Sequence, residues 1–210
     1  MKYLIFDTET TGLPNYKLPV NHTSQPHIVQ LAALLCDDIG QTYGQINLII
    51  EPVVEVPKIA SDIHGITTEI AQLTGVNIAV ALQCFTALYD KCDMLVAHNI
   101  EFDLQMIRRY YPYDLAGQKW FDYKPGFCTK LNSTAIVKAP LNDRQLAAKA
   151  RNPGWTPPGG WPEYKDPTLA ECYKHFFNKE IEGAHNAMVD VEACRDVFLS
   201  LKKVEGKADA

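Results

Sequence analysis

Residues 6–13 read FDTETTGL and place Asp7 and Glu9 directly after a hydrophobic run. Such a run is typical of a buried strand, whereas carboxylates are almost never fully buried without a partner. Alternate residues of an extended segment point to the same side of a sheet, so the two acids lie side by side. The pair is either solvated at a strand end or bound to a cation. Taken alone, a motif this short favours solvated acids.

Two further acids lie on the apolar faces of predicted helices. Asp103 belongs to the predicted helix 99–111, and Asp190 belongs to the closing helix that starts near residue 186. Residues three, four and seven positions away share a helix face. For both acids these positions are apolar, namely Met106, Ile107 and Tyr110 for Asp103, and Ala187, Cys194 and Val197 for Asp190. Two inward acids and a same-side pair on a strand indicate a metal site better than four solvated groups do.

The donor set of this predicted site consists of oxygens. No cysteine or histidine stands beside the four acids with metal-ligand spacing, and carboxylates select hard cations such as Mg²⁺ or Mn²⁺ over zinc. Four carboxylates carry more charge than one divalent ion neutralises, so the sequence predicts two divalent cations as cofactors. Paired ions of this kind stabilise the attacking and leaving oxygens in phosphodiester cleavage.

His185 precedes Asp190 by five residues, in the loop that enters the closing helix. A lone histidine in a loop is ordinarily a capping or surface residue. Imidazoles titrate near neutral pH and can take a proton from water. Beside the four acids, His185 is therefore a candidate general base.

The composition indicates a folded, soluble, intracellular protein. The 210 residues suit a single domain, with 47% hydrophobic and 21% charged residues. The formal net charge of −5 excludes a basic surface over the whole protein that would bind nucleic acid, but it does not exclude local binding of a strand. The six cysteines form no CxxC pair, which favours a reducing, cytoplasmic location over a disulfide framework. No segment approaches the roughly 20 apolar residues of a membrane span.

Hydrophobic periodicity predicts strands followed by strand–helix alternation. Strands are expected at 2–7, 27–38, 42–52 and 93–98, and a further strand within 120–129 is expected to end near residue 128. Helices are expected at 78–90, 99–111, 167–178 and 186–203, and short helical pieces at 60–73. Hairpin-length links join the first three strands, so they are expected to be antiparallel. Asn99 is expected to cap the 99–111 helix. The chain is expected to form one α/β domain over residues 1–204, with a flexible tail at 205–210.

A Pro/Gly/Trp-rich segment at about 139–167 interrupts this alternation and is expected to be a long loop. It is either an insertion packed by its own side chains or a lid over a substrate. Trp155 and Trp161 could stack on unpaired bases or fix the loop to the domain. Candidate local basic residues are Arg108 and Arg109 near the 99–111 helix, and Lys138, Arg144, Lys149 and Arg151 in or beside the loop.

The segments FDTETTGL, HNIEFD (98–103) and HNAMVD (185–190) resemble, in order, the three motifs of the DnaQ-like 3′–5′ exonuclease superfamily. The histidine five residues before the last acid resembles the DEDDh branch. IHGIT at 63–67 resembles a further family segment. The resemblance implies the ribonuclease-H-like fold, with a five-stranded mixed sheet whose first three strands are antiparallel.

The resemblance also implies roles for these residues. Asp7, Glu9, Asp103 and Asp190 become metal ligands, with Asp7 on both ions, and His185 becomes the general base. The expected products are nucleoside 5′-monophosphates, released from a DNA 3′ end that is single-stranded or frayed. Positions that would contact the terminal nucleotide are Thr10, Leu13, His64, Asn99 and Phe102. Core packing for Leu13 and Phe102, and turn or cap chemistry for Thr10 and Asn99, are the alternatives.

Two other functions stay open at this point. An RNA 3′-end-trimming exonuclease of the same superfamily differs in whether its pocket accepts a 2′-hydroxyl. A non-catalytic nucleic-acid-binding domain would be expected to have lost one of the four acids or His185, and all five are present. The expected partner is nucleic acid, while a polymerase partner and the oligomeric state are not predicted.

Overall fold

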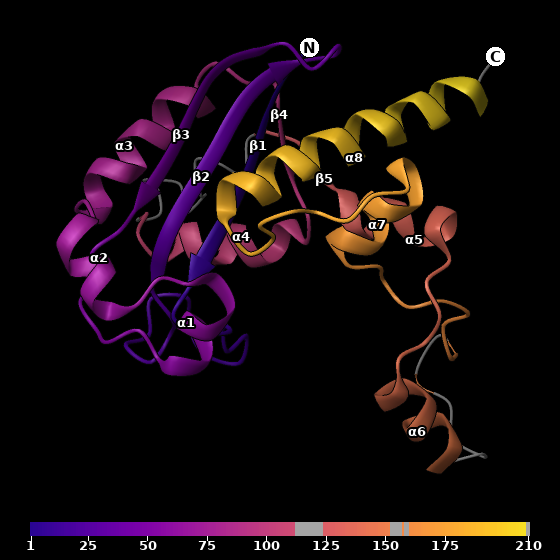
Figure 1. Ribbon diagram of the computed structural model, residues 1–210, viewed down its shortest axis with the longest axis horizontal. Helices are drawn as coiled ribbons and strands as arrows, with labels where there is room; N and C mark the ends of the chain where they lie inside the picture. The colour runs from indigo at the N-terminus through magenta and orange to yellow at the C-terminus, as the bar shows by residue number, and fades with distance from the viewer. Residues whose placement is uncertain (112–123, 152–156, 158–159, 209–210) are drawn as a thin grey trace.

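The computed structural model describes residues 1–111, 124–151, 157 and 160–208. Within these residues a five-stranded sheet has the order β3-β2-β1-β4-β5, with helices on both faces (Figure 1). The strands are β1 (Lys2–Thr10), β2 (Ile28–Asp37), β3 (Thr42–Ile49), β4 (Met94–Ala97) and β5 (Gly126–Cys128). The helices are α1 (Lys58–His64), α2 (Thr68–Thr74), α3 (Ile78–Tyr89), α4 (Ile100–Arg108), α5 (Thr129–Val137), α6 (Asp143–Arg151), α7 (Leu169–Phe177) and α8 (Ala187–Ala208).

The mixed sheet predicted from the sequence is confirmed. β1 pairs antiparallel with β2, and β2 pairs antiparallel with β3. The turn between β2 and β3 contains Gly40 at a φ of 86°, a left-handed conformation that glycine adopts without a steric cost. β4 and β5 run parallel to β1, as strand–helix alternation predicts.

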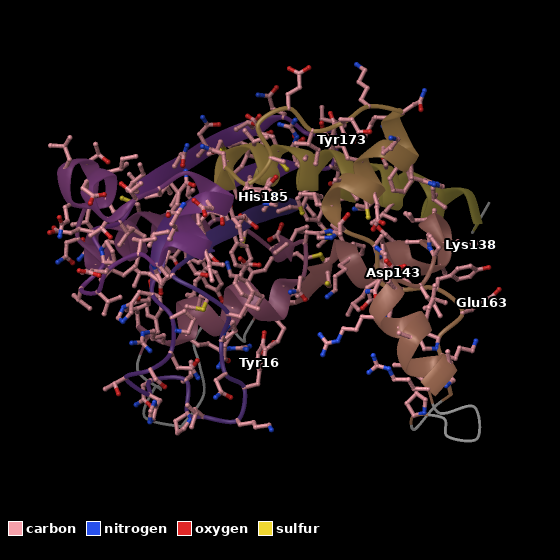
Figure 2. All side chains as sticks on the ribbon, turned by 60° about the horizontal axis from the view of Figure 1, so that its bottom comes forward. Tyr16, Lys138, Asp143, Glu163, Tyr173 and His185 are labelled. Atoms are coloured by element: carbon pink, nitrogen blue, oxygen red, sulfur yellow. The ribbon has the colours of Figure 1, made fainter. Side chains whose placement is uncertain are left out.

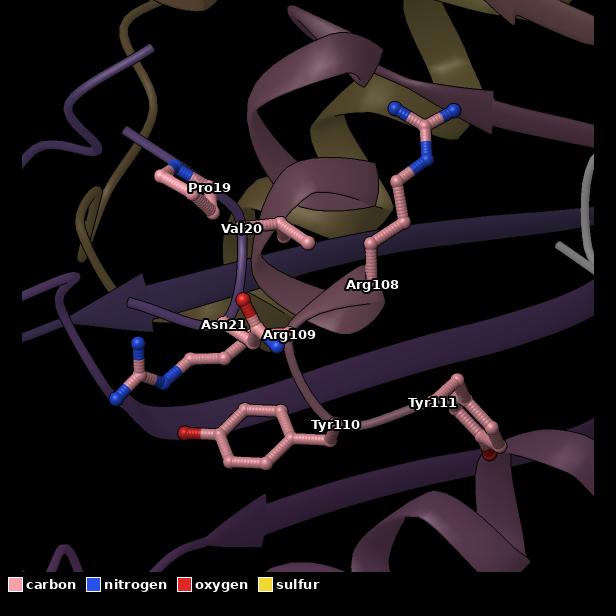
Figure 3. Close-up of a pocket in the computed structure, with 7 residues that line it drawn as sticks. All are labelled: Pro19, Val20, Asn21, Arg108, Arg109, Tyr110 and Tyr111. Atoms are coloured by element: carbon pink, nitrogen blue, oxygen red, sulfur yellow. The ribbon is translucent and has the colours of Figure 1, made fainter. Parts of the chain in front are cut away.

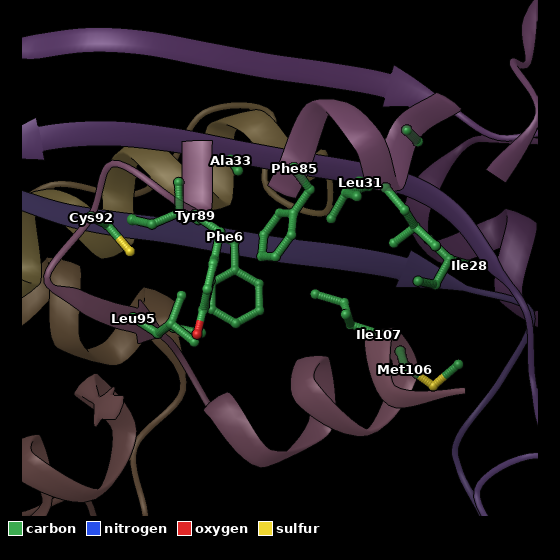
Figure 4. Close-up of a cluster of buried hydrophobic side chains, with 14 of the residues drawn as sticks. Phe6, Ile28, Leu31, Ala33, Phe85, Tyr89, Cys92, Leu95, Met106 and Ile107 are labelled. Carbon is green, nitrogen blue, oxygen red and sulfur yellow. The ribbon is translucent and has the colours of Figure 1, made fainter. Parts of the chain in front are cut away.

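Both faces of the central strand β1 are covered, and the strand's alternation decides what each face meets. Leu4 and Phe6 pack into a core with α3 and α4 (Figure 4). The Phe6 and Phe85 rings meet edge to face there, with their centroids 5.4 Å apart. Tyr3 and Ile5 point the other way and pack against α8. Because side chains alternate, Asp7 and Glu9 continue the α8 face, whereas Thr8 continues the α4 face. This alternation positions the candidate site.

Several predicted boundaries are wrong. α4 ends at Arg108 rather than residue 111. Asn99 does precede it, but at a φ of 78° and without a side-chain capping bond. The predicted loop 139–167 contains α6, and α8 extends to Ala208 through most of the predicted tail. Helix α5 was not predicted, because its threonines and serine obscure the helical pattern.

β5 ends at Cys128 as predicted, while residues 120–123 of that predicted strand and Trp155 lie outside the described residues. All six cysteines fall in the described part and are free, as the sequence suggested. Among the described helices, none combines the length and apolar character needed to cross a membrane.

Candidate active site

Three of the predicted metal ligands meet where β1 ends against the first turn of α8. Asp7 and Glu9 come from the strand and Asp190 from the helix, and a carboxylate oxygen of each lies within 4.8 Å of the others. The strand provides two same-side acids because its residues alternate, and the helix reaches them because Ala187, Val191 and Cys194 pack against the same face of the sheet. The sequence prediction that these three acids converge is therefore supported.

Asp103 reaches the site from the opposite face of the sheet. It is only 1% exposed on α4, where burial of Met106 and Ile107 holds its helix face inward. The Thr8 backbone N–H and hydroxyl both donate to Asp103 Oδ1, at 3.0 and 2.8 Å. These two bonds occupy one oxygen of the carboxylate and leave Oδ2 available to a cation.

The electrostatics of the cluster are those of acids without enough countercharge. Burial, then the charges of Asp103 and Asp190, raise the pKa of Asp7 well above its usual range. Burial and the Asp7 carboxylate raise the pKa of Glu9 to about 8. Burial also raises the pKa of Asp103, against the hydrogen bonds from Thr8 that lower it. Desolvated like charges of this kind must bind protons or a cation, and the all-oxygen donor set fits Mg²⁺ or Mn²⁺.

His185 lies in the loop before α8 and is exposed (Figure 2). Its backbone takes a φ of 67°, which is uncommon for a residue with a side chain. The His185 N–H donates to Asp190 Oδ2 at 3.1 Å, so the loop is fixed to one of the acids. Its imidazole also lies near enough to His64 to lower the pKa of His64, after the larger effect of burial.

A cavity of about 600 Å³ opens beside Glu9. Four of the five predicted nucleotide-binding residues line it, namely Thr10, Leu13, His64 and Phe102. Leu13 is 85% exposed, so plain core packing does not explain it. The Thr10 hydroxyl instead donates to the Gly12 carbonyl at 2.7 Å, which shapes the turn after β1.

The sequence did not reveal that α1 forms the far wall of this cavity. Ile59 and Ile63 face it and are 82% and 55% exposed. The i, i+4 spacing of the two isoleucines would ordinarily indicate a helix face packed on the core. Together with Leu13 they give the cavity an apolar rim, which suits the flat face of a base.

Asn99 does not line this cavity. Its Oδ1 accepts a hydrogen bond from the Lys130 ammonium group at 2.8 Å, which places a cation next to the start of α4. Its predicted contact with a nucleotide remains a prediction.

A second cavity, of about 470 Å³, is lined by Arg108 and Arg109 on one side and residues 19–21 on the other (Figure 3). Arg109 donates to the His22 carbonyl at 2.8 Å, and Arg108 pairs with Glu101 at 2.6 Å. Arg109 thus joins the end of α4 to the segment before β2, and Arg108 pairs within α4, so both arginines have partners in the protein itself.

A mixed five-stranded sheet whose central strand ends in carboxylates defines the ribonuclease-H-like class of nucleases and related enzymes. The RNase_T exonuclease family model matches residues 4–138, which is more than half of the chain. The protein therefore belongs to the RNase_T exonuclease family, within the DnaQ-like superfamily that its motifs resemble.

Curated relatives agree with this family. A DNA polymerase III subunit epsilon-like protein of Rhodobacter capsulatus is 34% identical over 202 residues, which are 96% of this chain and 24% of that protein. The DNA polymerase III PolC-type of Ureaplasma parvum is 27% identical over 95% of this chain and 11% of its own length. The chain thus spans less than a quarter of the length of either relative.

Solved structures support the fold. The chain is similar to E. coli exonuclease I in a complex with single-stranded DNA, with a TM-score of 0.66 and 18% identity over 98% of this chain and 41% of that one. It is also similar to exonuclease X in complex with 5′ overhanging duplex DNA, with a TM-score of 0.56 and 19% identity over 97% and 93% of the two chains.

Proposed function

We propose that the protein is a metal-dependent 3′–5′ exonuclease that removes nucleoside 5′-monophosphates from single-stranded or frayed DNA 3′ ends. The observation that carries this proposal is the meeting of Asp7, Glu9 and Asp190 within 4.8 Å beside a cavity of about 600 Å³ with an apolar rim. A base can lie in the cavity while its phosphate reaches the acids. The similar exonuclease I and exonuclease X structures are both complexes with DNA, which favours DNA over RNA.

The four acids would hold two divalent cations. Asp7 is central, because its pKa responds to both Asp103 and Asp190. When bound, such ions polarise the phosphate and lower the pKa of water that attacks it. The chain's own contribution is to fix the oxygens: β1 holds two of them, α8 one, and Thr8 orients the fourth through Asp103.

His185 would take the proton of the attacking water. Its side chain is exposed and its backbone N–H is held by Asp190, so the imidazole belongs to a residue anchored at the acid cluster. Thr10, Leu13, His64 and Phe102 would orient the terminal nucleotide, with the exposed Leu13 side chain against its base.

Digestion of 5′-labelled oligonucleotides tests the function. We expect single-stranded DNA to give a ladder that shortens from the 3′ end with Mg²⁺ or Mn²⁺ and stays intact with EDTA. Duplex DNA and RNA substrates are digested under the same conditions for comparison. Full-length substrate in every metal condition would contradict the proposal, and faster trimming of RNA than of DNA would replace it with the RNA-processing alternative.

Metal binding should also appear as a pH-dependent gain in thermal stability. The folded-state pKa of Glu9 is raised to about 8, so ionising it destabilises the metal-free fold as pH rises from its unfolded value, near 4, toward 8. Lowering the pH from 8 to 6.5 should therefore raise the free energy of unfolding of the metal-free protein by up to about 2 kcal/mol through Glu9 alone. In EDTA we therefore expect a higher melting temperature at pH 6.5 than at pH 8.

Mg²⁺ should then raise the melting temperature more at pH 8, where the carboxylates have lost their protons, than at pH 6.5. The control is Glu9→Gln, which removes the titration and should flatten both effects. Equal Mg²⁺ shifts at the two pH values, or none at either, would contradict cation binding by this cluster.

A further inference from the structure

Residues 139–165, which lie between α5 and α7 in the sequence, are named here the α6 arm, and the structure describes residues 139–151, 157 and 160–165 of it. In Figure 1 α6 stands well apart from the sheet, beyond the edge at which β1 ends, and the view of Figure 2 also shows it apart. No residue of α6 is buried. A helix of nine residues with no buried face gains nothing from packing and is marginal in water by itself.

The α6 arm is nevertheless built to be helical. Asn142 and Gln145 cap its start reciprocally: the Gln145 N–H donates to Asn142 Oδ1 at 2.9 Å, and the Asn142 N–H donates to Gln145 Oε1 at 3.0 Å. Alanine, leucine, arginine and lysine, all good helix formers, dominate the remaining turns of the helix. An exposed helix with such local support presents side chains to something outside the domain.

Charge identifies the kind of partner. The α6 arm contains four lysines and arginines against two acids, a net charge of +2. The rest of the chain therefore has a net charge of −7, which gives the total of −5. Arg144 and Arg151 are seven positions apart and share one face of α6. Within the described residues, neither these two nor Lys149 has an ion-pair partner. The three basic residues of α6 thus outnumber its one acid, on an element that stands apart from the body of an acidic protein.

The root of the α6 arm is fixed close to the candidate active site. The Lys165 N–H donates to the Ala139 carbonyl at 3.0 Å, and the Thr134 hydroxyl donates to Asp166 at 3.0 Å, which close the arm at its base. His98, which directly precedes the α4 N-cap Asn99, bridges the Thr129 hydroxyl at 3.0 Å and the Pro167 carbonyl at 3.1 Å. Burial lowers the pKa of His98 to about 4, so this bridge is neutral and stable near pH 7.

We infer that the α6 arm is a nucleic-acid-binding element whose Arg144 and Arg151 contact backbone phosphates of the DNA strand away from its 3′ end. The inference rests on the proposed function for the identity of the strand. The arm supplies sequence-independent, salt-sensitive affinity that the acidic body lacks, and its fixed root keeps the strand in line with the cavity beside Glu9.

The test is DNA binding without cleavage. Fluorescence anisotropy in EDTA measures the affinity for a single-stranded oligodeoxynucleotide longer than about 16 nucleotides, the upper end of ordinary single-strand sites. Arg144→Gln/Arg151→Gln should weaken binding roughly tenfold at low salt and reduce the slope of log K against log salt by about 1.4, two contacts at 0.7 each. The matched control is Lys91→Gln/Lys203→Gln. It removes the same charge from two exposed positions near the start of β1. Lys91 lies two residues before Asp93, which bonds to Lys2, and Lys203 follows Lys202, which bonds to Asp38.

Equal affinities and salt slopes for the two double variants would overturn the inference and leave an acidic protein as the partner of the arm. Hydrolysis of the p-nitrophenyl ester of thymidine 5′-monophosphate separates the arm from the chemistry, because this substrate has no strand to reach α6. The arm variant should hydrolyse this ester at the wild-type rate. A loss of ester hydrolysis as large as the loss of DNA affinity would overturn a role confined to binding. Wild-type protein that binds DNA but hydrolyses neither substrate would contradict the proposed function and leave the arm's role standing.

Discussion

Asp7→Asn is expected to reduce kcat of the exonuclease reaction by at least about 10²–10³-fold, the effect of removing a single preorganised hydrogen-bond donor from an active site. Burial, then the charges of Asp103 and Asp190, raise the pKa of Asp7 well above its usual range, and a carboxylate oxygen of Asp7 lies within 4.8 Å of oxygens of both Glu9 and Asp190. Asparagine keeps its shape and one oxygen but not the charge that binds a cation. Single-turnover digestion of 5′-labelled single-stranded DNA with Mg²⁺ measures the effect.

The same substitution should stabilise the metal-free protein. It removes a buried carboxylate that repels Asp103 and Asp190, so Asp7→Asn should melt above wild type in EDTA at pH 8 and gain less from added Mg²⁺. This opposite response of stability and activity separates a lost ligand from a damaged fold. Glu192→Gln is the matched control, because Glu192 is an exposed acid on the same helix as Asp190. Retention of more than a tenth of wild-type kcat in Asp7→Asn would contradict the metal role.

The four candidate acids could be predicted from the sequence because their signal is local and periodic. Strand alternation alone puts Asp7 and Glu9 on one face of β1, and helical spacing alone puts Asp103 and Asp190 inward. What the sequence could not predict is that Thr8, the residue between the two acids, turns to the other face and holds Asp103 with two hydrogen bonds. That contact joins residues 95 positions apart, which no local pattern specifies.

The elements that were missed lack an apolar stripe facing the core. α6 buries no side chain, so hydrophobic periodicity gives it no signal, and the Pro/Gly-rich residues after it favoured a loop. α1 shows the reverse error: Ile59 and Ile63 have the spacing of core residues but are largely exposed along the cavity. In both cases we propose that the exposed face contacts a molecule outside the chain, an environment that a single sequence does not contain.

His185→Asn is expected to lower kcat by about 10²–10⁴-fold, the usual contribution of a positioned general base. Asparagine is chosen because it tolerates the left-handed backbone that His185 adopts, at a φ of 67°, and because it cannot take a proton near neutral pH. The backbone N–H that donates to Asp190 is unchanged. Mg²⁺ should therefore raise the melting temperature of the variant as much as that of wild type.

This pairing of a large loss in kcat with intact metal stabilisation distinguishes His185 from the four acids. His175→Asn, at an exposed position on α7, is the matched control and should retain wild-type activity. If His185→Asn were as active as the control, the proton of the attacking water would have to leave by another route. Another imidazole beside the candidate site is that of His64, whose pKa burial lowers and whose Nδ1 already accepts from the Ile66 N–H at 3.1 Å. Because Nδ1 accepts this bond, Nε2 carries the ring hydrogen of neutral His64. His64 therefore has no unoccupied nitrogen to take a proton, which leaves His185 as the better base.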